Sequence, residues 1–256
     1  MTLMQEVILI ILFFITTFVG VITGSNSLIT VPAMFQFGID PKVAVATNMF
    51  GLTFMSIGAS IPFLREGAID LKRISPLIGL TLVSSALGAL LAIVMSADGL
   101  KLTISAAMIG VALFILFKRD VGVKKIEAIS SRAATISYAL AFLLGIYGGL
   151  YSGGYVTMLT AVLVAFFGLT FSQAVASTKV INIASSMVAT AIFMWEGLVD
   201  YKLGTILAVT MFAGAYAGAH WASKLNDIWL RRIFIATVIV LAIKTLFDIF
   251  WPISAN

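Results

Sequence analysis

The stretch VILIILFFITTFVGVITGSNSLITVPAMFQFGI, residues 7 to 39, decides the fold because it holds 33 uncharged residues in a row. A bilayer core of about 30 Å takes about 20 apolar residues as one helix. The stretch is therefore one full span followed by a remainder, residues 25 to 38, that is too short to cross again as a straight helix. A similar glycine-flanked stretch runs from 154 to 168. We expect both to be re-entrant or partial helices that face a cavity, because only protein or a water-filled cavity tolerates interrupted backbone at membrane depth.

Composition places the whole chain in a membrane. Of 256 residues, 61% are apolar and 11% are charged, and the mean hydropathy is +1.12. With no cysteine and one histidine, disulfides, iron–sulfur clusters, and thiolate or His-cluster metal sites are excluded, so we predict no cofactor and no metal. A Walker lysine motif is also absent, so the chain cannot hydrolyse ATP. The net charge of +5 indicates basic cytoplasmic loops rather than a nucleic-acid partner.

Long apolar runs predict an all-α polytopic membrane protein with about eight transmembrane helices. Charges and turn-forming residues separate the runs. No Lys or Arg precedes Lys42, so the first run lacks the basic region of a cleavable signal and should stay in the mature protein. The approximate cores are residues 5 to 24, 43 to 64, 75 to 95, 102 to 118, 133 to 152, 172 to 195, 202 to 222 and 232 to 250.

An internal duplication divides the chain. At an offset of 130 residues, 18 of the 69 positions from Gly24 to Ala92 are identical without a gap. We therefore predict two homologous four-helix repeats, residues 1–118 and 133–256, joined by a basic cytoplasmic linker at 119–132. The most telling match is a turn of the form E-G-x-x-D-x-K, in which Glu66, Gly67, Asp70 and Lys72 correspond to Glu196, Gly197, Asp200 and Lys202. We interpret these two turns as helix-capping connections.

The basic linker sets the expected orientation. The positive-inside rule assigns its cluster of Lys118, Arg119, Lys124, Lys125 and Arg132 to the cytoplasm. With four full spans per repeat, connections 65–73 and 196–202 also fall in the cytoplasm, and both partial helices open from the outside. The two repeats then share one orientation. One observation opposes this arrangement, because Lys224, Arg231 and Arg232 would lie outside.

Lys179 is the leading candidate for a substrate-binding residue. It lies in the apolar run from Phe171 to Trp195, roughly 12 Å from its start, where a charge is costly and normally faces an ion pathway. Asn182 and Ser186 follow on the same helix face, so that face suits a small oxyanion. The alternative is a lysine that extends to the interface or pairs structurally with a carboxylate.

Further candidates for substrate binding lie at similar depth. Thr47, Asn48 and Thr178 could donate hydrogen bonds. The glycine-bearing stretches before the two partial helices could unwind and expose helix N-termini to an anion. Their alternative roles are helix packing and capping. The candidates in these two stretches are Ser25, Asn26, Ser152, Gly153 and Gly154.

Seven segments together resemble the TauE/SafE sulfite exporter family, also described as sulfonate uptake permeases. They are GVITGSNSLITVP from residue 20, AVATN from 44, REGAIDLK from 65, GIYGGLYSGG from 145, AVASTKVIN from 174, WEGLVDYK from 195 and GAYAGA from 214. The sequence departs from the family at Ser25, Asn26 and Ser27, where glycines are usual, and at Asn48, where a small residue is usual.

The resemblance implies a secondary transporter for sulfite, sulfoacetate or another small organosulfur or carboxylate anion, with protons as a candidate coupling ion. Such a transporter would lie in the cytoplasmic (inner) cell membrane, surrounded by lipid. A homodimer is a candidate assembly. Two other functions stay open. One is an anion channel or membrane-assembly protein without coupled transport. The other is an intramembrane serine hydrolase that uses Ser152 and His220, although Gly149 and Ser152 lack the usual rhomboid spacing.

Overall fold

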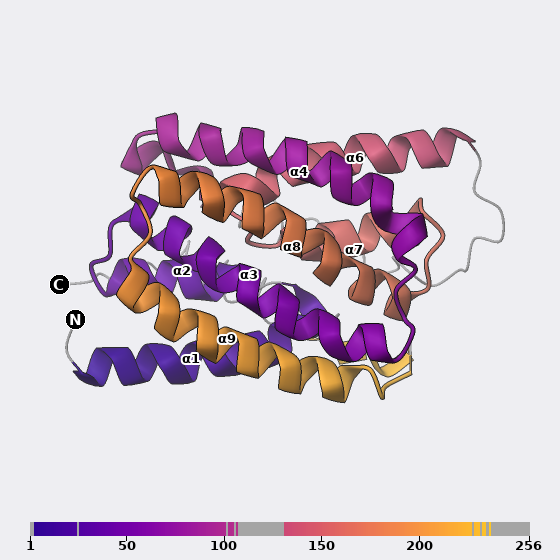
Figure 1. Cartoon of the computed structure of the whole chain (residues 1–256), viewed down its shortest axis with the longest axis horizontal. Helices are drawn as coiled ribbons and strands as arrows, with labels where there is room; N and C mark the ends of the chain where they lie inside the picture. The colour runs from indigo at the N-terminus through magenta and orange to yellow at the C-terminus, as the bar shows by residue number, and fades with distance from the viewer. Residues whose placement is uncertain are drawn as a thin grey trace.

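The computed structural model describes residues 3–24, 26–100, 102–104, 106, 131–226, 228–230, 232–233 and 236. All regular structure within these residues is helical. Six helices are long and apolar enough to cross a membrane, and they lie lengthwise in one bundle (Figure 1). They are α1 (Leu3–Thr23), α3 (Pro41–Arg65), α4 (Leu71–Val94), α6 (Ser131–Leu150), α8 (Phe171–Trp195) and α9 (Tyr201–Ala222).

These six helices confirm six of the eight expected spans. The other two expected cores, residues 102 to 118 and 232 to 250, lie largely outside the described residues. Most of the basic linker at 119–132 also lies outside them. The structure therefore establishes an all-helical membrane protein with six candidate spans.

Two short helices confirm the expected partial helices. α2 (Ser27–Gln36) has 10 residues and α7 (Tyr155–Ala165) has 11, so each is about 15 Å long and covers half a bilayer core. The breaks before them are made by Gly24 and Gly154, whose φ angles of +71° and +78° favour glycine. Both partial helices therefore begin where the backbone leaves the helical conformation.

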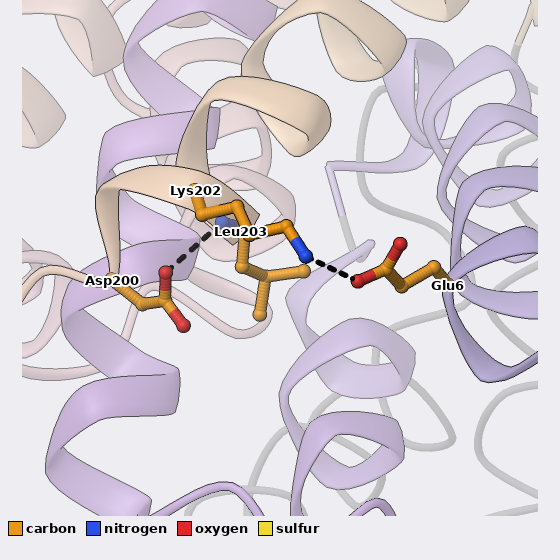
Figure 2. Close-up of polar contacts among 4 residues, drawn as sticks. All are labelled: Glu6, Asp200, Lys202 and Leu203. Atoms are coloured by element: carbon orange, nitrogen blue, oxygen red, sulfur yellow. Dashed lines mark hydrogen bonds and ion pairs between the residues drawn. The ribbon is translucent and has the colours of Figure 1, made fainter. Parts of the chain in front are cut away.

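The two related turns are helix-capping connections, as the sequence predicts. Asp70 Oδ1 accepts a hydrogen bond from the backbone N of Arg73 at 3.0 Å at the start of α4. Asp200 Oδ1 accepts one from the backbone N of Leu203 at 3.0 Å at the start of α9 (Figure 2). We call the end of the bundle that holds residues 66–70 the turn-66 end, and the end that holds residues 196–200 the turn-196 end.

Inter-helix contacts fix the direction of each long helix. Asp200 donates from its backbone N to Thr47 Oγ1 at 3.1 Å, and Arg65 donates to the Tyr216 hydroxyl at 3.5 Å, so α3 and α9 are parallel. The turns at 66–70 and 196–200 reverse the chain, so α4 and α8 run the opposite way. α1 is parallel to α9, because Glu6 contacts Lys202 and, further along both helices, Phe18 contacts Gly218. In the same way α6 is parallel to α4, because Thr81 lies beside Gly145 and Gly88 beside Leu150.

Helices at matched sequence positions, α1 and α6, α3 and α8, and α4 and α9, therefore run in opposite directions, and the expectation of one shared orientation is wrong. The reason is that α2 returns the chain beside α3, because Asn48 Nδ2 donates to Ser27 Oγ at 3.0 Å while the end of α2 leads directly into the start of α3. α1 and α2 together make no net crossing. The connections 65–73 and 196–202 consequently lie at opposite ends of the bundle.

The tips of the two helical hairpins, α1–α2 and α6–α7, meet inside the bundle. In Figure 1, α1 and α2 occupy the left part and α6 and α7 the right part. Thr157 donates to the Thr23 carbonyl at 2.6 Å, and the Tyr151 hydroxyl donates to the Ser27 carbonyl at 3.0 Å. Both partial helices therefore start from the same central region, and the expectation that both open from one side is wrong.

Small residues bring neighbouring helices into close contact at Gly88 on α4 and at Gly214 and Gly218 on α9. A Cβ atom on Gly214 would lie 2.8 Å from the Phe14 carbonyl oxygen, and one on Gly218 would overlap the Phe18 carbonyl oxygen. On α4, a Cβ atom on Gly88 would overlap the Ile146 carbonyl oxygen of α6. Backbone atoms cannot move aside as a flexible side chain can.

We expect Gly88→Leu to destabilise the protein by about 1–3 kcal/mol or more, because it forces α4 away from α6. Gly79→Leu on the same helix is the matched control, since a Cβ there meets no atom within 4 Å. Thermal unfolding in detergent should show a lower midpoint for Gly88→Leu only. Equal midpoints for the two variants would mean that this helix contact contributes little.

Candidate functional site

Lys179 is the one buried charged side chain in the part of the chain that the structure describes. It lies on α8, eight residues after Phe171, and is 2% exposed. It makes no hydrogen bond or ion pair with a described residue. The side chain therefore lies inside the bundle and does not extend to its surface. An unpaired buried ammonium is costly and usually marks a functional site.

Asn182 lies one turn from Lys179 and faces α3. Its Nδ2 donates to Ser56 Oγ at 2.8 Å, and its Oδ1 is buried without a partner among the described atoms. Because a serine hydroxyl both donates and accepts, the Asn182 amide can turn over and present either group to a ligand. Ser186 is less available, because its hydroxyl donates to the Asn182 backbone carbonyl at 2.6 Å. Lys179 therefore offers a positive charge, and Asn182 offers the half of its amide that does not contact Ser56.

Three other predicted binding residues make structural hydrogen bonds. Asn48 accepts from Thr30 Oγ1 at 2.8 Å as well as donating to Ser27, so it holds the first turn of α2 against α3. Thr47 anchors the start of α9 through the backbone N of Asp200. The Thr178 hydroxyl donates to the Val175 carbonyl of its own helix at 2.7 Å. These contacts position helices around the centre of the bundle.

The first hairpin tip contributes Asn26, which is 3% exposed and precedes α2. Its side chain makes no capping hydrogen bond, and its Nδ2 is buried without a partner among the described atoms. Asn26 is therefore a free hydrogen-bond donor at the tip. Ser25, the preceding candidate, lies outside the described residues.

The second tip is a strained turn rather than a set of free side chains. Ser152 has a φ angle of +72° and is 4% exposed, and Gly154 directly precedes α7. The Gly153 carbonyl accepts a hydrogen bond from the Tyr147 hydroxyl. Few non-glycine residues adopt such a φ angle, so the surrounding structure holds Ser152 in place.

The starts of α2 and α7 give the central region a positive electrostatic character. The first backbone N–H groups of a helix lack intrahelical partners, and the helix dipole places partial positive charge there. The two starts meet at the hairpin tips. On α3, Asn48 contacts Ser27 at the first tip and Ser56 contacts Asn182. These two α3 residues are eight positions, or about 12 Å, apart. The two helix starts and Asn26 favour an anion at the tips, and Lys179 favours one beside Asn182.

Nearly the whole sequence matches a known family. The family model described as Sulfite exporter TauE/SafE matches residues 8–245. The chain belongs to the TauE/SafE sulfite exporter family. A probable membrane transporter protein ORF9 of Sinorhizobium sp. is 30% identical over 236 residues, which cover 92% of this chain and 90% of that protein.

Other relatives of this TauE/SafE chain have similar names and lengths. A probable membrane transporter protein of Haemophilus influenzae is 27% identical, with 93% of each chain covered. The probable membrane transporter protein YfcA of Escherichia coli K12 is also 27% identical, with 93% of this chain and 89% of that protein covered. No solved structure matches significantly. The relatives agree with the expected function of a membrane transporter.

The structure does not bring together the two residues of the hydrolase alternative. Ser152 is buried at the second hairpin tip. His220 is exposed in the last turn of α9, where its ring stacks on Tyr216 with centroids 6.5 Å apart. No contact joins Ser152 to His220 in the described residues. This TauE/SafE chain therefore lacks an assembled serine–histidine pair there.

Sequence reasoning missed several residues that hold the hairpin tips in place, of which Tyr151 and Thr157 connect the two hairpins. Tyr147, Tyr151, Thr157 and Thr30 make contacts to the tips or to Asn48. One signal was present in the sequence, because three of the six tyrosines lie four residues apart at 147, 151 and 155. That spacing is the helical period, but it runs across the break: Tyr147 lies on α6, Tyr151 in the turn, and Tyr155 at the start of α7.

Proposed function

We propose that this protein is a secondary active transporter for a small organosulfur or related anion, such as sulfite or sulfoacetate, in the cytoplasmic membrane. Protons are the proposed coupling ion, and alternating access of the two halves moves the substrate. The observation that carries this proposal is the buried Lys179, which has no partner among the described residues. The proposed binding site consists of Lys179, Asn182 and Asn26 with the starts of α2 and α7.

We also infer that the two halves are inverted repeats, each with a helical hairpin that makes no net crossing and, counting the spans expected at 102 to 118 and 232 to 250, three crossing helices. The antiparallel helices, the matched breaks at Gly24 and Gly154, and the matched caps at Asp70 and Asp200 support this inference. Transporters with inverted repeats bind substrate near the bilayer midplane, beside interrupted helices. The meeting hairpin tips fit that arrangement. Each half would then open the site to one side of the membrane.

The distribution of cations supports a cytoplasmic turn-66 end. Only Lys42 and Lys202 are cations near helix ends at the turn-196 end of the described structure. In the antiparallel arrangement Lys224 lies at the more basic end. It therefore no longer lies outside, as it would in a parallel arrangement. The cations near helix ends at the turn-66 end include Arg65, Lys72, Arg73 and Lys224.

Flux measurements in proteoliposomes test the proposed function. The purified protein should carry labelled sulfite or sulfoacetate in a saturable manner, and a pH gradient should increase net uptake. Empty liposomes and competition by unlabelled anion are the controls. Flux that does not saturate and ignores the pH gradient would indicate a channel. No flux of either anion would overturn the organosulfur assignment.

A further inference from the structure

Lys179 has no acidic partner on any described helix that packs against α8. α3 carries no titratable side chain from 43 to 64, and α4 carries none from 74 to 94. α8 itself carries only Lys179. The titratable side chains on the facing parts of α6 and α7 are Tyr138, Tyr147 and Tyr155, with Tyr151 in the turn between these helices. Within the described helices that pack against α8, only neutral groups therefore surround the amine.

A charged ammonium in such surroundings needs an anion to offset the loss of its hydration. A bound anion needs the positive charge for the same reason. Each of the two therefore strengthens the binding of the other, and this coupling is reciprocal. The site is most stable when it holds both a proton and an anion, or neither.

We propose that Lys179 carries the coupling proton, so that one proton crosses the membrane with each anion. This inference rests on the proposed transport function. At the open side, the neutral amine takes a proton from water and the anion binds against the resulting ammonium. At the other side, the anion leaves and the ammonium returns its proton to water. The site then reorients empty, with a neutral amine.

The matched position in the first half explains why the ratio is one proton per anion. Met49 occupies the place on α3 that Lys179 occupies on α8, and it is fully buried. The described half-site on α3 therefore has no second amine. Asn182, with its free amide group, can contact either the ammonium or the anion without changing its own charge.

Lys179→Arg tests the inference, because arginine keeps the positive charge but cannot release a proton in a protein. In proteoliposomes, two modes are measured with the same labelled sulfite or sulfoacetate. One mode is anion exchange without a pH gradient, and the other is net uptake driven by a pH gradient. We expect the ratio of net uptake to exchange to fall roughly tenfold or more in Lys179→Arg. Lys72→Arg, an exposed lysine at the turn-66 end, should keep the wild-type ratio.

The outcomes separate this inference from the proposed function. Wild-type protein that transports either anion supports the function whatever the variants do. An unchanged ratio in Lys179→Arg, or its complete loss of exchange while it remains folded, would overturn Lys179 as the proton carrier. Because wild type and Lys179→Arg carry the same substrate species, the substrate's own protonation cancels in the comparison.

Discussion

Lys179→Met should reduce anion uptake by roughly a hundredfold at limiting substrate while the protein stays folded. Contacts to a charged group contribute about 1.5–3 kcal/mol, and about 1.4 kcal/mol corresponds to a factor of ten. Methionine fits a buried helical position, as the matched Met49 demonstrates on α3. Removal of an unpaired buried charge should also leave thermal stability equal or higher. Initial uptake rates and detergent melting midpoints measure the two effects.

Lys72→Met is the matched control for this substitution, because Lys72 is exposed at the start of α4. Its uptake rate should stay within about twofold of the wild type, since exposed charges contribute little. Normal uptake by Lys179→Met would remove the buried lysine from the transport path. A large fall in its melting midpoint would instead indicate a structural role.

Cysteine labelling should place Glu66 and Glu196 on opposite sides of the membrane. Both residues are exposed, both follow the last residue of a long helix, and they are matched positions in the two halves. The chain has no cysteine, so each single variant carries one thiol. In oriented vesicles, a membrane-impermeant maleimide should label Glu66→Cys only from the cytoplasmic side and Glu196→Cys only from the other side.

The labelling result is all-or-none, because a charged reagent does not cross lipid. Opening the vesicles with detergent should label both variants equally and serves as the control for reactivity. Labelling of both variants from the same side would contradict the antiparallel arrangement. Exchange of the two sides would preserve the arrangement but reverse the orientation that the basic residues indicate.

The local structure could be predicted from the sequence, but the direction of the second half could not. The uncharged run from 7 to 39 is too long for one span and too short for two, and this alone predicts a partial helix. Direction depends on whether the partial helix returns the chain to its starting side. That return is fixed by the contact of Asn48 with Ser27, which is a tertiary contact between helices. An error of one crossing per half reverses the orientation of everything that follows.

The candidate site was predictable where a residue is chemically unusual in its segment. Lys179 stands out because a lysine is rare deep in an apolar run. Asn48 and Thr47 are also polar residues in an apolar run, yet in the structure both have hydrogen-bond partners in other segments of the chain. Sequence reveals how costly a buried polar group is, but partners from distant segments decide whether it stays free for a ligand.

The hydrogen bonds between the hairpin tips have a consequence for biogenesis. The Thr23 carbonyl at the end of α1 accepts a hydrogen bond from the hydroxyl of Thr157, 134 residues later in the chain. This contact between the two tips can form only when both hairpins are present in the membrane. The first hairpin therefore reaches its final conformation only after the ribosome has delivered the second, so completion of the membrane centre is a late step of insertion.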